Sequence, residues 1–153
     1  MADFIIDISN NVVLITAIGG WFVAQLIKAI LYAFLNHEFK LERLVGSGGM
    51  PSSHASTMMA AVVASWVNFG PKSFEFGICA ILAIIVLHDA SGVRLETGKQ
   101  AEVLNKLIRH GDLNELFSDE TYLKELVGHT PFQVLVGSVI GTIIGILMCN
   151  LAF

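Results

Sequence analysis

Apolar residues dominate four stretches of the chain, and polar or charged residues are largely confined to the segments between them. The four stretches cover residues 11–35, 53–69, 74–93 and 131–153. A helix needs about 20 mostly apolar residues to cross the hydrocarbon core of a bilayer, with a range of roughly 17–25. The pattern predicts an all-α integral membrane bundle of about four transmembrane helices, forming a single domain over residues 1–153.

Composition supports a membrane location. Hydrophobic residues make up 54% of the chain and charged residues 14%, against roughly a quarter charged in soluble domains. The N-terminal MADFIIDISN has no basic residue, so it lacks the positive region of a cleavable signal peptide, and we expect the first span to be retained. Cys79 and Cys149 lie inside predicted spans without metal-ligand spacing, so we expect no disulfide framework and no metal site.

The basic residues indicate an orientation in the membrane. Seven loop lysines and arginines fall within residues 36–52 and 94–130, whereas the opposite side carries only Lys72. The positive-inside rule places the basic loops in the cytoplasm. Within the long loop, residues 98–110 have the spacing of an amphipathic helix. Such a cytoplasmic helix either lies on the membrane as a lid or packs against the bundle as a connector.

Two predicted spans have a histidine in the polar segment at their cytoplasmic start. Residues 46–56, GSGGMPSSHAS, lead into one span, and residues 128–133, GHTPFQ, lead into another. A helix N-terminus offers free N–H groups and a partial positive charge, so two of them form an anion site. The glycines, including Gly49, let the backbone approach a phosphate closely. The alternative is a flexible loop in which serine merely caps a helix.

The motifs at these two helix starts resemble those of the type 2 phosphatidic acid phosphatase superfamily. Two further matching motifs lie between these helix starts. The four motifs are PSSH at 51–54, HDASGVR at 88–94, GKQAEVLN at 98–105 and GHTP at 128–131. They are most similar to its divergent branch, small membrane proteins labelled acid phosphatase or vanadium-dependent haloperoxidase related. The resemblance covers nearly the whole chain.

This resemblance implies a role for each matching residue. His129 becomes the nucleophile that accepts the phosphoryl group, and His54 becomes the acid that protonates the leaving oxygen. Arg94 and the amides near Ser52 and Ser53 hold the phosphate oxygens. The resemblance implies neither a metal nor a cofactor. The lysine of the first superfamily motif is either Lys28 or Lys40, with Arg43 as a companion.

The chain departs from the superfamily pattern at three points. Ser53 stands where the pattern has glycine, and Gln133 stands where an aspartate usually orients the nucleophilic histidine. Arg94 and His129 are separated by about 35 residues rather than a few. Asp89, at the end of the third span, is the candidate to orient His129 instead.

Lys28 lies inside the first predicted span. An ionisable residue within a membrane helix is a functional candidate by default. Alternatively, its long stem extends toward the cytoplasmic surface.

Gly137, Gly141 and Gly145 form a repeated GxxxG in the last predicted span. This spacing allows close helix packing in lipid. The partner is either another helix of the same chain or a second copy in a homodimer.

These features lead to one expected function and one rival. We expect a membrane phosphatase that hydrolyses a phosphomonoester or pyrophosphate on a lipid or prenyl substrate through a phosphohistidine. The rival is a non-catalytic protein that binds or translocates a phosphorylated lipid or anion. The expected partners are membrane lipid and the phosphorylated lipid, with no nucleic acid. We place the protein in a bacterial cell membrane with its site facing the cytoplasm.

Overall fold

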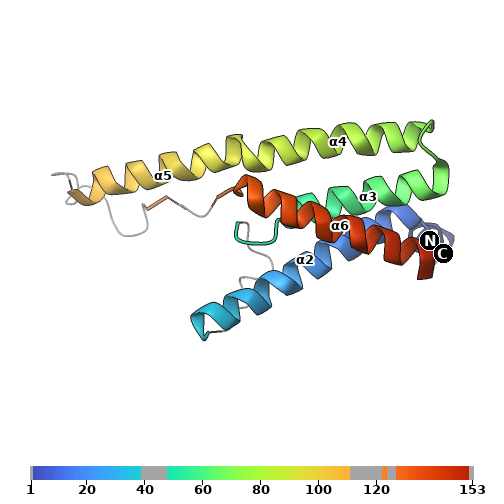
Figure 1. Cartoon of the computed structure of the whole chain (residues 1–153), viewed down its shortest axis with the longest axis horizontal. Coiled ribbons are helices and arrows are strands. Elements are labelled where there is room, and N and C mark those ends of the chain that lie inside the picture. The colour runs from blue at the N-terminus through green and yellow to red at the C-terminus, as the bar shows by residue number, and fades with distance from the viewer. Residues whose placement is uncertain (1, 39–47, 111–121, 124–126, 152–153) are drawn as a thin grey trace.

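The computed structural model describes residues 2–38, 48–110, 122–123 and 127–151, and its regular elements are all helices (Figure 1). Lys40 and Arg43 lie outside these described residues. The helices are, in order, α1 (Ala2–Ser9), α2 (Val12–Asn36), α3 (Ser53–Phe69), α4 (Phe74–Ser91), α5 (Val93–His110) and α6 (Pro131–Leu151).

The predicted all-α membrane bundle is confirmed. Among the described residues, Val12–Asn36, Phe74–Ile108 and Pro131–Leu151 are long and apolar enough to cross a membrane. Helix α3 has 17 residues and lies centrally, in contact with α2, α4 and α6. Because α3 is at the short end of the length that spans a bilayer, a count of four crossings stays a prediction.

Local sequence fixes where the helices begin. The side-chain oxygens of Asn11, Ser52 and Ser73 cap α2, α3 and α4 by accepting backbone N–H groups three residues later, at 3.0, 3.3 and 3.1 Å. Thr130 and Gln133 form a reciprocal capping box at the start of α6. These caps set the starts of α3 and α6, and therefore the positions of the two histidines beside them.

Small residues let α6 pack closely against α3. A methyl group on Gly137 would overlap the carbonyl oxygen of Ser52, and one on Gly141 would overlap the backbone of Ser56. A methyl group on Gly145 would lie 2.7 Å from the side chain of Val63, which is also too close. The GxxxG residues therefore pack against α3 of the same chain. This is the first of the two partners considered above, another helix of the same chain. Homodimerisation stays a prediction, and it would require a different surface.

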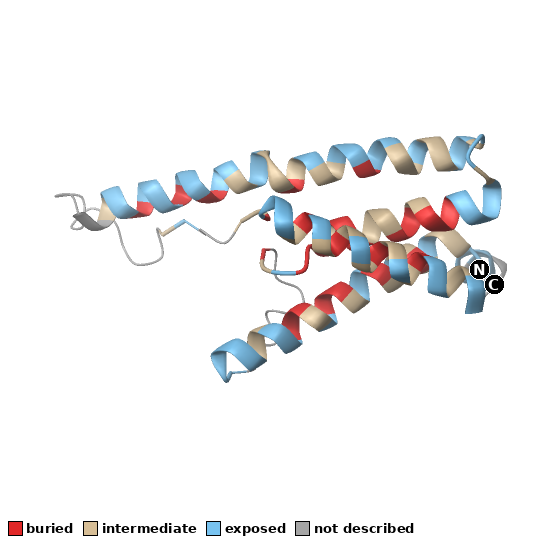
Figure 2. Ribbon diagram, viewed as in Figure 1, coloured by how far each residue is buried: buried red, intermediate tan, exposed pale blue. Residues whose placement is uncertain are grey.

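Large apolar side chains lie mainly on the outside of the bundle. Figure 2 shows buried residues on the facing sides of α2, α3 and α6, with exposed residues on the outer sides. Alanine and serine dominate the interior, whereas side chains such as Phe22 and Ile84 are exposed. This distribution suits a protein whose helices contact lipid, since small residues allow close helix approach there.

Helix α5 begins earlier than predicted and continues α4. The two helices are separated only by Gly92, whose N–H donates to the His88 carbonyl at 2.8 Å. Figure 1 shows α5 extending beyond the bundle in line with α4. Among the described helices α5 contacts only α4, so the predicted connector packing against the bundle is not observed. Its Asn105 side chain bonds both backbone groups of Leu123.

Candidate active site

The structure brings the two predicted histidines together at one end of the bundle. The ring centroids of His54 and His129 are 5.9 Å apart, with the planes inclined at 62°. Two backbone hydrogen bonds hold this geometry: Ser52 N–H donates to the Gln133 carbonyl at 3.2 Å, and His129 N–H donates to the Ala90 carbonyl at 2.9 Å. The starts of α3 and α6 are thereby joined to each other and to the end of α4.

Gly128 explains how motifs far apart in sequence meet. Its φ of +84° is one that other residues rarely adopt. A methyl group there would overlap the backbone of Arg94 and Leu95. The segment before α6 therefore crosses directly over the start of α5, which brings His129 to the end of α4 despite the long intervening loop.

His129 is buried, with 2% of its surface exposed, and its ring is held by a backbone carbonyl. Its Nδ1 lies 3.0 Å from the carbonyl oxygen of Gly49. A proton on Nδ1 then donates to that carbonyl and leaves the Nε2 lone pair available. Burial first, then the charge of Lys28 and the His54 ring, lower the pKa of His129 to about 4, against the weaker opposing effect of hydrogen bonds with Gly49 and Gln133. The ring is therefore neutral at pH 7.

Lys28 lies in the site rather than at the membrane surface. It is 5% exposed, and its Cγ and Cδ pack 3.9 Å from the position that a Cβ would take on Gly49. Its charge acts on both His54 and His129. The alternative in which this lysine extends to the surface does not fit such burial.

Asp89 pairs with Arg94 instead of orienting His129. Arg94 Nε donates to Asp89 Oδ2 at 2.6 Å, with the two side chains 46% and 42% exposed. Both charges act on His54, so they border the site. Among the described residues the hydrogen-bond partner of His129 Nδ1 is the Gly49 carbonyl, so the contact between Asp89 and His129 that we expected is not observed.

Gln133, Ser52 and Ser53 shape the two helix starts. Gln133 Oε1 accepts the Thr130 N–H at 3.0 Å, so this residue works as a helix cap as well as interacting with His129. The hydroxyl and the backbone N–H of Ser52 are both engaged in hydrogen bonds. The hydroxyl caps α3, and the N–H donates to the Gln133 carbonyl. Within the part of the chain that the structure describes, the first-turn amides of α3 without a hydrogen-bond partner are then those of buried Ser53 and of His54.

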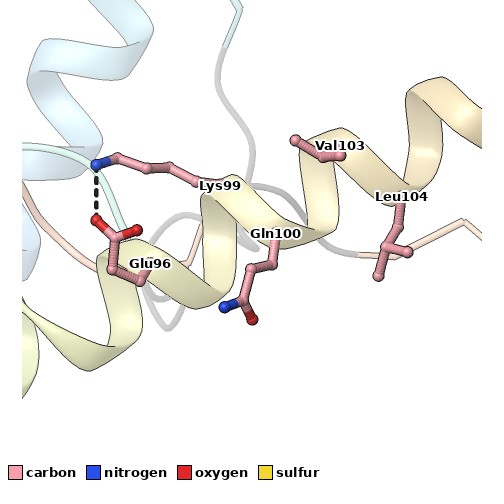
Figure 3. A pocket seen from close by; sticks show the side chains of 5 residues that line it. All are labelled: Glu96, Lys99, Gln100, Val103 and Leu104. Carbon is pink, nitrogen blue, oxygen red and sulfur yellow. Dashed lines mark hydrogen bonds and ion pairs between the residues drawn. The ribbon is translucent and has the colours of Figure 1, made fainter.

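One ring nitrogen at the histidine pair has no hydrogen-bond partner in the described structure. The Nδ1 atom of His54 is buried and has no hydrogen-bond partner among the described residues. No group of three histidine, cysteine, aspartate or glutamate side chains within the described ranges could hold a metal ion. A hollow of about 480 Å³ lies along α5 (Figure 3), where Lys99 bonds Glu96 at 2.7 Å, but it contains none of the site residues.

Comparison with known proteins defines the class. A model of the divergent PAP2 family matches residues 9–144, so the chain belongs to the divergent PAP2 family. It is similar to the uncharacterized membrane protein YuiD of Bacillus subtilis (strain 168), with 29% identity over 154 residues, covering 93% of this chain and 96% of YuiD. No solved structure matches it. The protein is therefore an integral membrane protein of a phosphatase-related family.

Proposed function

We propose that the protein is a membrane phosphatase that hydrolyses a phosphomonoester or pyrophosphate on a lipid or prenyl substrate through a phosphohistidine on His129. The observation that carries this proposal is the pairing of His54 and His129, with ring centroids 5.9 Å apart, at the adjoining starts of two helices. Such helix starts present N–H groups and a partial positive charge to an anion.

The first chemical step uses the neutral His129 ring. Its Nε2 lone pair attacks phosphorus while Nδ1–H donates to the Gly49 carbonyl. The bond from phosphorus to the leaving oxygen breaks, and His54 gives that oxygen a proton. The products are the dephosphorylated lipid and a phosphohistidine at His129.

The second step returns the protein to its starting state. Neutral His54 takes a proton from a water molecule as the water oxygen attacks phosphorus. The phosphorus–nitrogen bond breaks, which restores neutral His129 and releases inorganic phosphate. Lys28, Arg94 and the amides of Ser53 and His54 supply positive potential for the phosphoryl oxygens in both steps.

Phosphate release from purified protein tests this function. Protein in detergent is given a panel of lipid phosphates and prenyl pyrophosphates, in the presence of a chelator. We expect release of inorganic phosphate that falls by about a thousandfold or more in His129→Ala. Full turnover by His129→Ala would refute the phosphohistidine mechanism.

A second candidate function is supported by one observation. In the described residues no carboxylate bonds His129, because Asp89 is paired with Arg94. An imidazolium formed during phosphoryl transfer would then be stabilised by a carbonyl dipole rather than by a full negative charge. A non-catalytic protein that binds or translocates the phosphorylated lipid needs no such charge, and in the same assay it would bind the lipid yet release no phosphate.

A further inference from the structure

A pocket of about 310 Å³ opens beside the histidines, between the C-terminal part of α2 and the short segment before α3. Most of its lining consists of apolar side-chain atoms and backbone atoms. The lining residues include Lys28, Leu31, Leu35, Gly48, Gly49 and Met50. Small-molecule pockets have this character, with an apolar lining and a few polar groups that fix orientation.

Gly49 connects this pocket with the candidate active site. On one side, the Cγ and Cδ atoms of Lys28 pack against Gly49 at the inner end of the pocket. On the other, the Gly49 carbonyl holds His129 Nδ1 at 3.0 Å. Gly49 therefore lines the pocket and also contacts the candidate active site.

The pocket changes from buried and charged to exposed and apolar along α2. Lys28 is 5% exposed at the inner end, whereas Leu31 is 37% and Leu35 is 73% exposed nearer the mouth. Helix α2 is long and apolar enough to cross a membrane, so we expect these exposed leucines to face lipid. Tyr32 and Asn36 add polar groups at the end of the helix.

We propose that this pocket binds the part of a lipid phosphate's apolar chain next to the headgroup, which enters from the membrane between α2 and residues 48–50. The proposal rests on the proposed function and specifies its substrate class as a phosphate or pyrophosphate on a single flexible hydrocarbon chain. Lys28 complements the anionic end of this ligand, and Leu31, Leu35 and Met50 contact the chain.

The pocket gives the protein a basis for selecting long-chain substrates. Each methylene group of a water-soluble alkyl phosphate that moves from water into the pocket raises affinity by roughly fourfold, whereas a chain that enters from lipid is already in an apolar medium and does not make this gain. A soluble aryl phosphate reaches the same histidines without using the pocket and gains nothing from it. For alkyl phosphates short enough to stay dissolved in water, we therefore expect kcat/KM to rise steeply with chain length until the pocket is filled.

Filling the pocket with a larger side chain tests the proposal through relative activity. Leu31→Trp narrows the pocket, and Ile30→Trp adds the same side chain at an exposed neighbouring position outside it. We expect Leu31→Trp to lower the ratio of kcat/KM for a water-soluble alkyl phosphate to that for an aryl phosphate by about tenfold or more. Ile30→Trp leaves the ratio unchanged. An equal ratio in the two variants would overturn the assignment.

Crosslinking tests the pocket independently of catalysis. Wild-type protein in detergent is irradiated with an alkyl phosphonate that carries a diazirine close to its headgroup, and the adducts are mapped by mass spectrometry. We expect adducts at Leu31, Leu35 or Met50 that excess alkyl phosphate suppresses. Adducts spread over all lipid-facing surfaces without suppression would overturn the pocket. If these adducts form but no phosphate is released from any substrate, the pocket stands and the phosphatase function fails.

Discussion

The carbonyl oxygen of Gly49 lies 3.0 Å from Nδ1 of His129, although 80 positions separate the two residues in sequence. Gly49 adopts φ +80°, a backbone conformation that residues with a side chain rarely adopt. In this conformation its carbonyl oxygen points toward His129. The described partner of His129 Nδ1 is therefore a backbone carbonyl rather than a carboxylate. Its effect is to fix the ring orientation and tautomer without adding a negative charge.

Replacing Gly49 should affect activity more than stability. Gly49→Ala forces an alanine to φ +80°, which costs about 1–2 kcal/mol and tilts the carbonyl away from His129. Gly70→Ala is the matched control, because Gly70 has the same φ and no neighbour within 4 Å of an added methyl group. We expect both variants to lose thermal stability, but a loss of phosphate release only in Gly49→Ala. Equal activities would show that the carbonyl does not position His129.

The His129 ring should titrate in the acid range. Its pKa is lowered to about 4, mainly by burial and next by Lys28, so between about pH 4 and the ordinary value near 6.5 the folded ring stays neutral while an exposed ring is protonated. Histidine NMR signals in detergent, assigned with His129→Gln, measure this. Lys28→Gln should raise the pKa partway toward its usual value. A His129 signal that titrates near 6.5 in wild type would contradict the buried, neutral nucleophile.

Close packing of α6 against α3 predicts a sharp difference between two glycines. Gly141→Ala places a methyl group against the Ser56 backbone, and such overpacking costs about 1–3 kcal/mol. Gly77 lies in helix α4 with no neighbour within 4 Å of an added methyl group, so Gly77→Ala should be neutral or slightly stabilising. Thermal unfolding in detergent compares the two variants. Equal melting temperatures would show that the GxxxG stripe does not pack within the chain.

The orientation in the membrane can be read from two exposed lysines. Lys72 lies in the turn before α4, and Lys99 lies in α5, so the two positions are at opposite ends of α4 (Figure 1). In a background with Cys79→Ala and Cys149→Ala, a membrane-impermeant thiol reagent on intact cells should label Lys72→Cys and spare Lys99→Cys. The reverse pattern would place the histidines outside the cell.

Hydrophobic runs and helix-capping residues were sufficient to predict most of the fold. The predicted span 53–69 coincides with α3, and the others match helix bounds within a few residues. Helix α1 was not predicted because 8 residues are too few for a clear periodic pattern. The predicted start of α5 was too late, since Gly98 resembles a helix boundary in sequence but lies within a continuous helix.

The candidate site was only partly predictable because its geometry depends on tertiary contacts. The polar segments at the helix starts identified His54 and His129, because their motifs are local. The pairing of Asp89 with Arg94 and the direction of the Gly49 carbonyl depend on how the starts of α3, α5 and α6 meet. Every residue has a backbone carbonyl, so the residue types in a sequence do not reveal which carbonyl will contact a given histidine.

The most direct test of the central claim is to trap phosphate on the protein during turnover. Wild-type protein mixed briefly with a radiolabelled lipid phosphate and quenched in alkali should carry label on His129 alone, since phosphohistidine survives alkali and is lost in acid. His54→Ala should acquire the label more slowly and retain it for longer, because it lacks both the acid of the first step and the group that activates water in the second. Phosphate release by wild-type protein with no label on His129, or with label on another residue, would contradict the account.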